Sequence, residues 1–177
     1  MTKHCVCHRQ KYAQHIGVAL YSVVESNINS HPCFHLFIDD ISQEDITKLH
    51  QISDEYQHFG IVLHTINDTP LKSLPILDRI SIAMYYRFSV ANTLCGVADK
   101  VLYLDVDVIC LGELHTLFAL EMHDCIVGAV PDSFTGIVPC RNRLHELGFN
   151  SILPYFNSGV LLINTKQWVA HGIDDKI

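Results

Sequence analysis

Residues 101–110 read Val-Leu-Tyr-Leu-Asp-Val-Asp-Val-Ile-Cys, an apolar run interrupted only by Asp105 and Asp107. A short apolar run of this kind is typical of a buried strand. Successive strand side chains point to opposite faces, so the two aspartates are predicted to lie close together on one face. Like charges so placed repel, and the pair therefore indicates a divalent cation with oxygen ligands, a shared proton or an exposed strand tip. In the last case the strand would leave the sheet at Leu104, which the apolar 108–111 stretch argues against.

Short apolar strands alternate with helical patterns on both sides of this run. Strands are predicted near residues 4–7, 33–38, 60–66, 100–106, 125–130 and 158–164, and helices near 12–27, 42–57 and 79–94. This alternation is typical of an α/β fold with a mostly parallel sheet flanked by helices. Ligands of such sheets bind at the carboxyl ends of the strands, where Asp105 and Asp107 are expected. Ser42, with Asp45 three residues later, is predicted to cap the second helix.

Composition places the chain among folded globular proteins. Its 177 residues, 49% of them hydrophobic, fit a single domain over residues 1–177. A net charge of −7 with only 12 unclustered Lys and Arg residues argues against nucleic-acid binding. The seven cysteines are odd in number and irregularly spaced, which favours reduced thiols in a cytosolic protein.

The apolar stretch 16–24 follows basic residues, as in a signal peptide. Ile16, Leu20, Val23 and Val24 fall at helical spacing and no small-residue cleavage site follows, so an amphipathic helix is predicted instead. No run approaches the roughly 20 apolar residues of a membrane span, so we expect no transmembrane segment.

Four blocks of the sequence together resemble glycosyltransferase family 8, in particular its bacterial lipopolysaccharide glucosyl- and galactosyltransferases. In chain order they are Phe-His-Leu-Phe-Ile (34–38), Ile-Ser-Ile-Ala-Met-Tyr-Tyr-Arg-Phe (80–88), Ala-Asp-Lys-Val-Leu-Tyr-Leu-Asp-Val-Asp-Val (98–108) and Tyr-Phe-Asn-Ser-Gly-Val-Leu-Leu-Ile-Asn (155–164). The resemblance implies a GT-A-type, Rossmann-like fold, a UDP-sugar donor, a glycan or glycolipid acceptor and transfer with retention. It also implies Mn²⁺ or Mg²⁺ as cofactor. The expected location is the cytoplasm, with peripheral contact at the inner face of the cytoplasmic membrane as an open alternative.

The resemblance assigns roles to individual residues. Asp105 and Asp107 match the metal-binding pair, and Asp105 also faces the donor. Arg87 and Asp132 match donor-binding residues, and Asn157 matches a position near the reacting carbon. Gly159 is expected to let the backbone approach the ligand closely, whereas structural roles are expected for Asn164 and Trp168. No group that supports retention is identified.

Each of three assignments has a structural alternative. Arg87 could be a helix-surface arginine paired with an acid such as Asp78. Asp132, after Pro131, could simply form a turn, and Asn157 could be a turn residue before a strand.

The chain departs from the family pattern at both ends. After the first strand, His8-Arg9-Gln10-Lys11 stands where the family carries acids that help to hold the base, and only Tyr12 keeps the pattern as a donor-binding residue. The sequence stops at Ile177, before the family's Asp-Gln-Asp and His-x-Gly-x-x-Lys-Pro-Trp segments. We therefore expect a domain incomplete at its C-terminus, without the family's third metal ligand, and prone to self-association through uncovered apolar surface.

Three other interpretations remain open. The chain could be an inactive remnant that binds the donor. Asp105-x-Asp107-x-Ile109 approaches the signature of haloacid-dehalogenase-like phosphohydrolases. Cys5, Cys7 and His8 could belong to a zinc site, although no second pair of ligands follows at the usual spacing.

Overall fold

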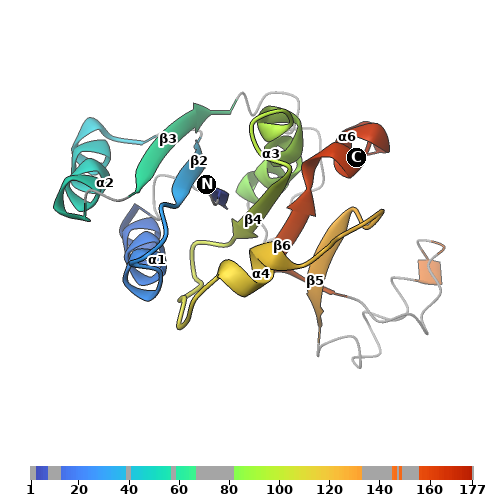
Figure 1. Ribbon diagram of the computed structural model, residues 1–177. Coiled ribbons are helices and arrows are strands. Elements are labelled where there is room, and N and C mark those ends of the chain that lie inside the picture. The colour runs from blue at the N-terminus through green and yellow to red at the C-terminus, as the bar shows by residue number, and fades with distance from the viewer. Residues whose placement is uncertain are drawn as a thin grey trace.

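The computed structural model describes residues 3–7, 13–38, 41–56, 59–66, 82–132, 145–146, 148 and 156–176. Its elements are, in chain order, β1 (Lys3–Cys7), α1 (Ala13–Ser26), β2 (Cys33–Ile38), α2 (Gln43–Tyr56), β3 (Gly60–Thr65), η3 (Ile82–Tyr85), α3 (Tyr86–Leu94), β4 (Lys100–Leu104), α4 (His115–Ala119), β5 (Val127–Pro131), β6 (Phe156–Asn164), α6 (Thr165–Ala170) and η5 (Asp174–Lys176). This order confirms the predicted α/β class, and Figure 1 shows the helices around the sheet.

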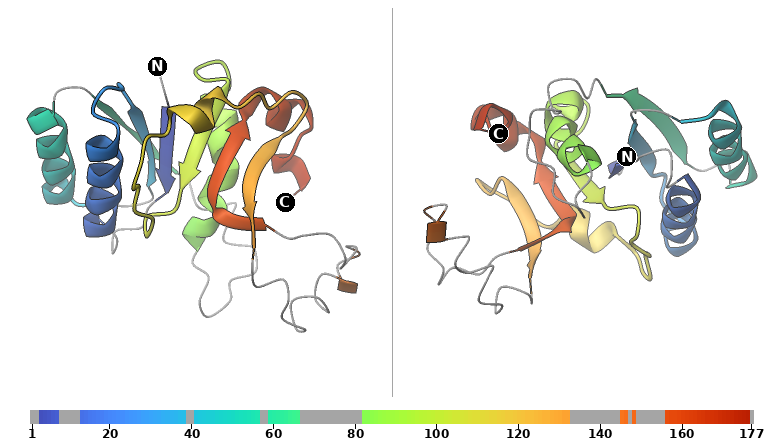
Figure 2. Two further views of the ribbon diagram at one scale, coloured as in Figure 1. Left: turned by 60° about the horizontal axis from the view of Figure 1, so that its bottom comes forward. Right: turned by 180° about the vertical axis from the view of Figure 1, so that it is seen from behind.

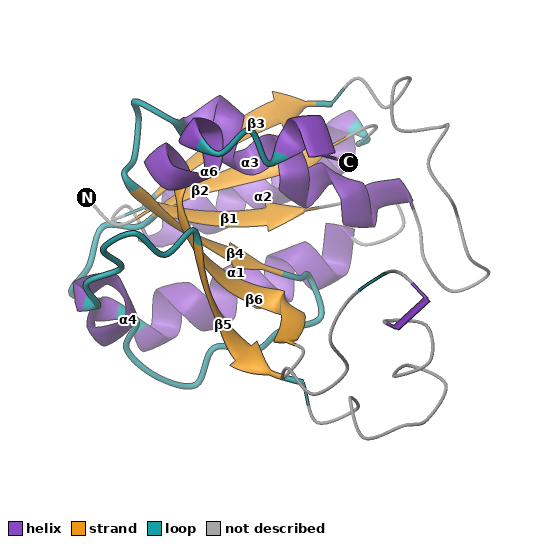
Figure 3. Cartoon of the chain, turned by 90° about the vertical axis from the view of Figure 1, so that its right-hand side faces the viewer, coloured by secondary structure: helices purple, strands orange, loops and turns teal. Residues whose placement is uncertain are grey.

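The six strands form one sheet in the order β3-β2-β1-β4-β6-β5. β3, β2, β1 and β4 run parallel, whereas β6 is antiparallel to both β4 and β5. Figure 3 shows this order and the shared direction of the first four strands. The mostly parallel sheet is therefore confirmed, and the reversal at β6 places the start of that strand beside the end of β4.

Each face of the sheet is covered by helices. On one face, buried side chains of β2 and β4 pack against α1, α2 and α4; they include Phe34, Leu36, Ile38, Leu102 and Leu104. On the other face, alternate residues of the same strands pack against η3, α3 and α6; they include Phe37, Val101 and Tyr103. Figure 2 shows the sheet between these two groups of helices. The period-2 alternation along β4 thus directs Tyr103 toward α3.

α1 has the predicted amphipathic character. Ile16, Leu20, Val23 and Val24 are buried, as the helical spacing indicated. The chain contains no helix, within the described residues, that is both long and apolar enough to cross a membrane. At α2 the predicted cap is confirmed, because the Asp45 N–H donates to Ser42 Oγ at 3.1 Å and the Ser42 hydroxyl donates to the Asp45 carboxylate at 2.8 Å.

His64, in β3, is half-buried beside other rings of the sheet. Its ring stacks on Phe37, with ring centroids 4.7 Å apart, and its Nε2 lies 2.8 Å from Nδ1 of the buried His35. Burial lowers the pKa of His64 below its ordinary value of 6.5. The neutral ring is therefore the form that suits the folded chain.

This burial predicts an acid-sensitive contribution to stability. His64 has a lower pKa in the folded than in the unfolded chain, so its contribution is complete above the unfolded pKa and is lost as the pH falls below it. In His64→Gln, which keeps a hydrogen-bonding group, the free energy of unfolding should fall less between about pH 7 and about pH 5 than in the wild type. Urea unfolding at both pH values measures the difference, with the exposed His50→Gln as control. An equal decrease in the free energy of unfolding between the two pH values, in the wild type and in both variants, would contradict this expectation.

Candidate active site

The carboxyl edge of the parallel strands brings most of the predicted site residues together. Leu104, the last residue of β4, pairs with Val160 of the antiparallel β6, and the Asp105 N–H donates to the Gly159 carbonyl at 2.8 Å. Pro131 at the end of β5 pairs with Phe156. The ends of β4 and β5 therefore meet the start of β6 at one edge (Figure 3). Tyr12 and the segment 8–11 lie outside the described residues.

Arg87 is buried beneath this edge, with 9% of its surface exposed. Its Nε donates to the Met84 carbonyl at 2.7 Å and its Nη1 to the Ser158 carbonyl at 2.6 Å. Its Nη2 lies 3.3 Å from Asp105 Oδ1, in an ion pair. The alternative of a helix-surface arginine is therefore wrong, because α3 turns this residue toward the sheet. Asp78, its suggested partner, lies outside the described residues.

Tyr103 completes the support of Asp105. Its hydroxyl donates to Asp105 Oδ1 at 2.5 Å, and its ring lies under the Arg87 guanidinium, 4.9 Å from the ring centroid to Cζ. Sequence reasoning did not single out Tyr103. The available signal was its spacing, because a tyrosine two residues before an aspartate shares its face of a strand. Two donors thus hold Oδ1, and Oδ2 faces Gly159.

The two aspartates do not share a strand face, which corrects the prediction from the sequence. β4 ends at Leu104, and Asp105 to Val108 form a turn in which the Val108 N–H donates to the Asp105 carbonyl at 3.3 Å. The strand therefore ends at Leu104, as in the alternative that placed both aspartates at an exposed strand tip. Only Asp107 is exposed, however, since the Asp105 side chain is 34% exposed and held by Arg87.

Asp107 borders a hollow of about 320 Å³ between the start of α1 and the turn. Its other lining residues are Gln14, His15, Val18, Val106 and Ile109. Because Asp107 stands in solvent at this hollow, it can offer both carboxylate oxygens to a ligand.

A bulge in β6 shapes the neighbouring wall. Ala129 pairs with Leu161 but Val130 pairs with Asn157, so residues 158–160 have no partner on β5. The bulge frees the Ser158 carbonyl for Arg87. Asn157 Oδ1 accepts the Gly159 N–H at 2.8 Å, the turn geometry expected in the structural alternative, while its exposed amide nitrogen has no partner among the described residues. Asp132 follows β5 directly, one residue beyond the Pro131–Phe156 pair, and is half-buried.

Asp105 presents one carboxylate oxygen, Oδ2, to the space beside Gly159. A Cβ on residue 159 would lie 3.0 Å from Asp105 Oδ2 and 3.1 Å from Asn157 Oδ1, so glycine keeps the space beside the carboxylate open. Carboxylate oxygens are the ligands that Mn²⁺ and Mg²⁺ prefer. Within the described part of the chain no group of three or more His, Cys, Asp or Glu side chains could hold a metal. The site therefore offers a cation at most two carboxylates, leaving positions for a ligand that brings its own oxygens.

The structural roles predicted for Asn164 and Trp168 are confirmed. Asn164 caps α6 by accepting the Gln167 N–H at 3.2 Å. Trp168 is buried and donates from Nε1 to Asp174 at 2.6 Å. Both lie at the opposite end of β6 from Asn157. The side chains of the suggested zinc ligands Cys5, Cys7 and His8 are outside the described residues.

Comparison with known proteins identifies the fold and the relatives of this chain. The sequence model of glycosyl transferase family 8 matches residues 5–177. Lipopolysaccharide glucosyltransferase WaaO of Escherichia coli K12 is 35% identical over 158 residues, which make up 89% of this chain and 46% of that protein. Lipopolysaccharide 1,3-galactosyltransferase of Salmonella typhimurium LT2 is 31% identical over 160 residues, 90% of this chain and 47% of that protein. The chain spans about half the length of these curated relatives.

A solved structure agrees with this result. The crystal structure of the galactosyltransferase LgtC, in complex with donor and acceptor sugar analogs, superposes with a TM-score of 0.84 at 27% identity and covers 96% of this chain and 60% of that one. The fold is thus GT-A-type, as the resemblance implied. These matches leave the haloacid-dehalogenase interpretation without support.

Proposed function

This chain belongs to glycosyltransferase family 8, and we propose that it forms the donor-binding domain of a metal-dependent, retaining hexosyltransferase. The proposed reaction moves glucose or galactose from a UDP-sugar to lipopolysaccharide or another surface glycan. The choice of hexose is supported by the similar glucosyl- and galactosyltransferases. The proposed location is the cytoplasm.

The observation that carries the proposal is the Arg87–Asp105 pair at the carboxyl edge, with Asp107 and Asn157 beside it. Asp105 Oδ2 and the exposed Asp107 carboxylate would hold Mn²⁺ or Mg²⁺. Such a cation, when bound, neutralises the charge that develops on a departing diphosphate.

The other residues prepare this edge for a nucleotide sugar. Arg87 fixes the Asp105 carboxylate through Oδ1, and the other N–H groups of its Nη atoms would donate to oxygen atoms of the nucleotide sugar. The exposed Asn157 amide nitrogen can donate to a sugar hydroxyl, and Asp132 can accept a hydrogen bond from another. We propose Tyr12, directly before α1, as a further donor contact.

The assay that tests the proposal follows UDP release from UDP-glucose and UDP-galactose with Mn²⁺, with and without a lipopolysaccharide core oligosaccharide. Acceptor-dependent release that EDTA abolishes is expected, and NMR of the product should show an unchanged anomeric configuration. GDP-mannose serves as the control donor. UDP release at the same rate with EDTA as with Mn²⁺ would contradict the proposed metal dependence.

An inactive donor-binding remnant is the second candidate. The same assay separates the two candidates, because a remnant should bind UDP in the presence of Mn²⁺ without releasing UDP from either sugar nucleotide.

Gly159 provides a local test of the proposed cation site. In Gly159→Ala the new methyl group would press on Asp105 Oδ2, and the carboxylate cannot turn away freely because Arg87 and Tyr103 hold its other oxygen. Affinity for Mn²⁺ in the presence of UDP should fall by about fivefold. Calorimetry measures it, with Gly60→Ala as control, since a Cβ there meets only Cys33 Sγ at 3.8 Å. Wild-type affinity in Gly159→Ala would show that the cation does not use this oxygen.

A further inference from the structure

The position of Asp107 depends on the backbone that carries it. Its side chain makes no hydrogen bond or ion pair within the described part of the chain, in contrast to Asp105. Upstream, the backbone is tied to the sheet where the Asp105 N–H donates to Gly159. Downstream, residues 108–114 run to α4 without regular secondary structure. We refer to residues 105–114 as the aspartate loop.

Three polar side chains at the end of α1 hold the downstream half of this loop. Ser22 Oγ accepts the Cys110 N–H at 2.9 Å, and the Ser26 hydroxyl donates to the Cys110 carbonyl at 3.0 Å. The N–H and the carbonyl of Cys110, three residues after Asp107, are therefore both hydrogen-bonded to neighbouring turns of α1.

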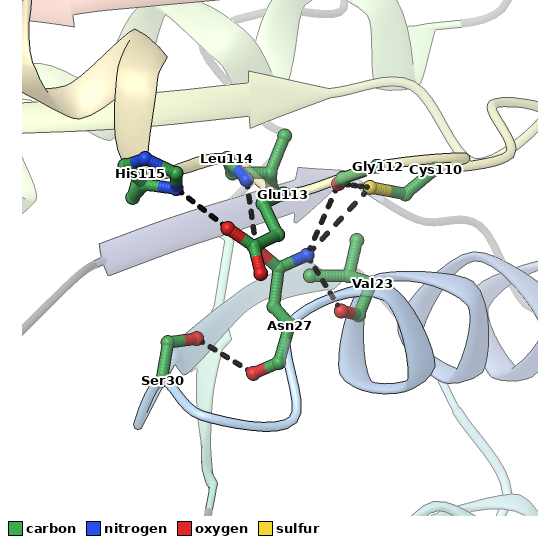
Figure 4. A network of polar contacts seen from close by, with 8 residues as sticks. All are labelled: Val23, Asn27, Ser30, Cys110, Gly112, Glu113, Leu114 and His115. Atoms are coloured by element: carbon green, nitrogen blue, oxygen red, sulfur yellow. Dashed lines mark hydrogen bonds and ion pairs between the residues drawn. The ribbon is translucent and has the colours of Figure 1, made fainter.

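Asn27, the residue after the last residue of α1, extends the attachment. Its side chain is buried; Oδ1 accepts the Leu114 N–H at 2.8 Å, and Nδ2 donates to the Gly112 carbonyl at 3.4 Å. Nδ2 also donates to the Val23 carbonyl at 2.9 Å, which fixes the amide on the helix end. Figure 4 shows Asn27 between the helix and the loop. We call Ser22, Ser26 and Asn27 the α1 clamp.

Apolar packing alone does not define the position of the loop. Val106, Val108 and Leu114 pack against the core cluster that contains Ile16 and Leu20. Such contacts are non-directional, so they tolerate small shifts along the helix. Hydrogen bonds with fixed donors and acceptors do not tolerate them, because a shift would leave partly buried backbone groups unsatisfied.

From these contacts we propose that the α1 clamp positions Asp107 for the cation, so that Ser22, Ser26 and Asn27 are positioning residues of the site. The inference rests on the proposed function, since it assumes that Asp107 binds the metal. It adds that the affinity for the metal is set partly by residues that touch neither metal nor donor. Supporting groups hold a metal ligand in the position that the metal requires. Their loss therefore lowers the affinity of the site for the metal.

The experiment compares Ser22→Ala/Ser26→Ala and Asn27→Ala with the wild type and with Ser30→Ala. Ser30 is the matched control, since its hydroxyl donates to the Asn27 carbonyl at 2.9 Å but does not contact the loop. Three quantities are measured: amide hydrogen exchange of residues 105–114 without ligand, Mn²⁺ affinity with UDP present, and the free energy of unfolding. Ser22→Thr/Ser26→Ala, which keeps one hydroxyl, tests recovery.

Both clamp variants should exchange the loop amides faster and bind Mn²⁺ more weakly by about fivefold or more. Ser30→Ala should match the wild type, and Ser22→Thr/Ser26→Ala should recover part of the affinity. A double variant that folds, exchanges its loop amides faster and binds Mn²⁺ like the wild type would overturn the positioning role alone. If the wild type itself bound no Mn²⁺ with UDP, the proposed function would fail, and the inference with it. If Asn27→Ala does not fold, the serine variants decide the outcome.

Discussion

Replacing Arg87 with alanine is expected to lower the free energy of unfolding by about 2–4 kcal/mol. Arg87 is buried and satisfies the Met84 and Ser158 carbonyls as well as the Asp105 carboxylate. Its removal leaves all three acceptors short of a donor and opens a cavity beside Tyr103. Urea unfolding measures the loss, and Arg87→Lys should lie between the wild type and alanine because an ammonium cannot reproduce the planar fork.

The control for this prediction is an ion pair in solvent. Lys48 binds Glu44 at 2.6 Å on the exposed face of α2. Lys48→Ala should change the free energy of unfolding by less than about 1 kcal/mol, because exposed pairs contribute little. An equally small effect of Arg87→Ala would contradict the assignment of Arg87 as a buried support of the site.

Replacing Asp107 with asparagine is expected to weaken Mn²⁺ binding in the presence of UDP at least tenfold, about 1.4 kcal/mol. Asparagine keeps the size of the side chain but removes the charge that a hard cation requires. Stability should be almost unchanged, since the Asp107 side chain is exposed and makes no contact that an asparagine would lose. Calorimetric titration of Mn²⁺ with UDP present measures the affinity.

Two further variants complete this test. Asp99→Asn removes a carboxylate at the amino end of β4, where Asp99 pairs with Lys166 at 2.9 Å, and should bind Mn²⁺ like the wild type. Asp105→Asn should weaken binding as Asp107→Asn does. Undiminished affinity in Asp107→Asn would remove this residue from the cation site.

The fold was predictable because its information is local. Apolar periodicity placed α1, with Ile16 and Leu20 inward, and Ser42 marked the start of α2. The alternation of strands and helices indicated a parallel sheet, and four of the six strands, β3, β2, β1 and β4, pair in parallel. The antiparallel direction of β6 was not predictable, because strand direction depends on a connection that no local pattern specifies.

The site was only partly predictable for a related reason. The apolar residues after Asp105 suggested that the strand continues, but Val106 and Val108 pack on the core from a loop. The apolar character of Val106 and Val108 predicts that they are buried. It does not distinguish a strand from a loop that packs on the core. The environment of Arg87 was also hidden, since its partners Asp105 and Ser158 lie 18 and 71 residues away in the chain.

We propose that this chain binds a uridine diphosphate donor through a metal held at the carboxyl edge of its sheet. The most direct measurement is a calorimetric titration of UDP into the wild-type protein, once with Mn²⁺ and once with EDTA. The proposed site predicts saturable binding with Mn²⁺ and an affinity at least about tenfold lower with EDTA, because two carboxylates alone repel the diphosphate. Equal affinity in the two titrations, or no binding in either, would contradict the claim.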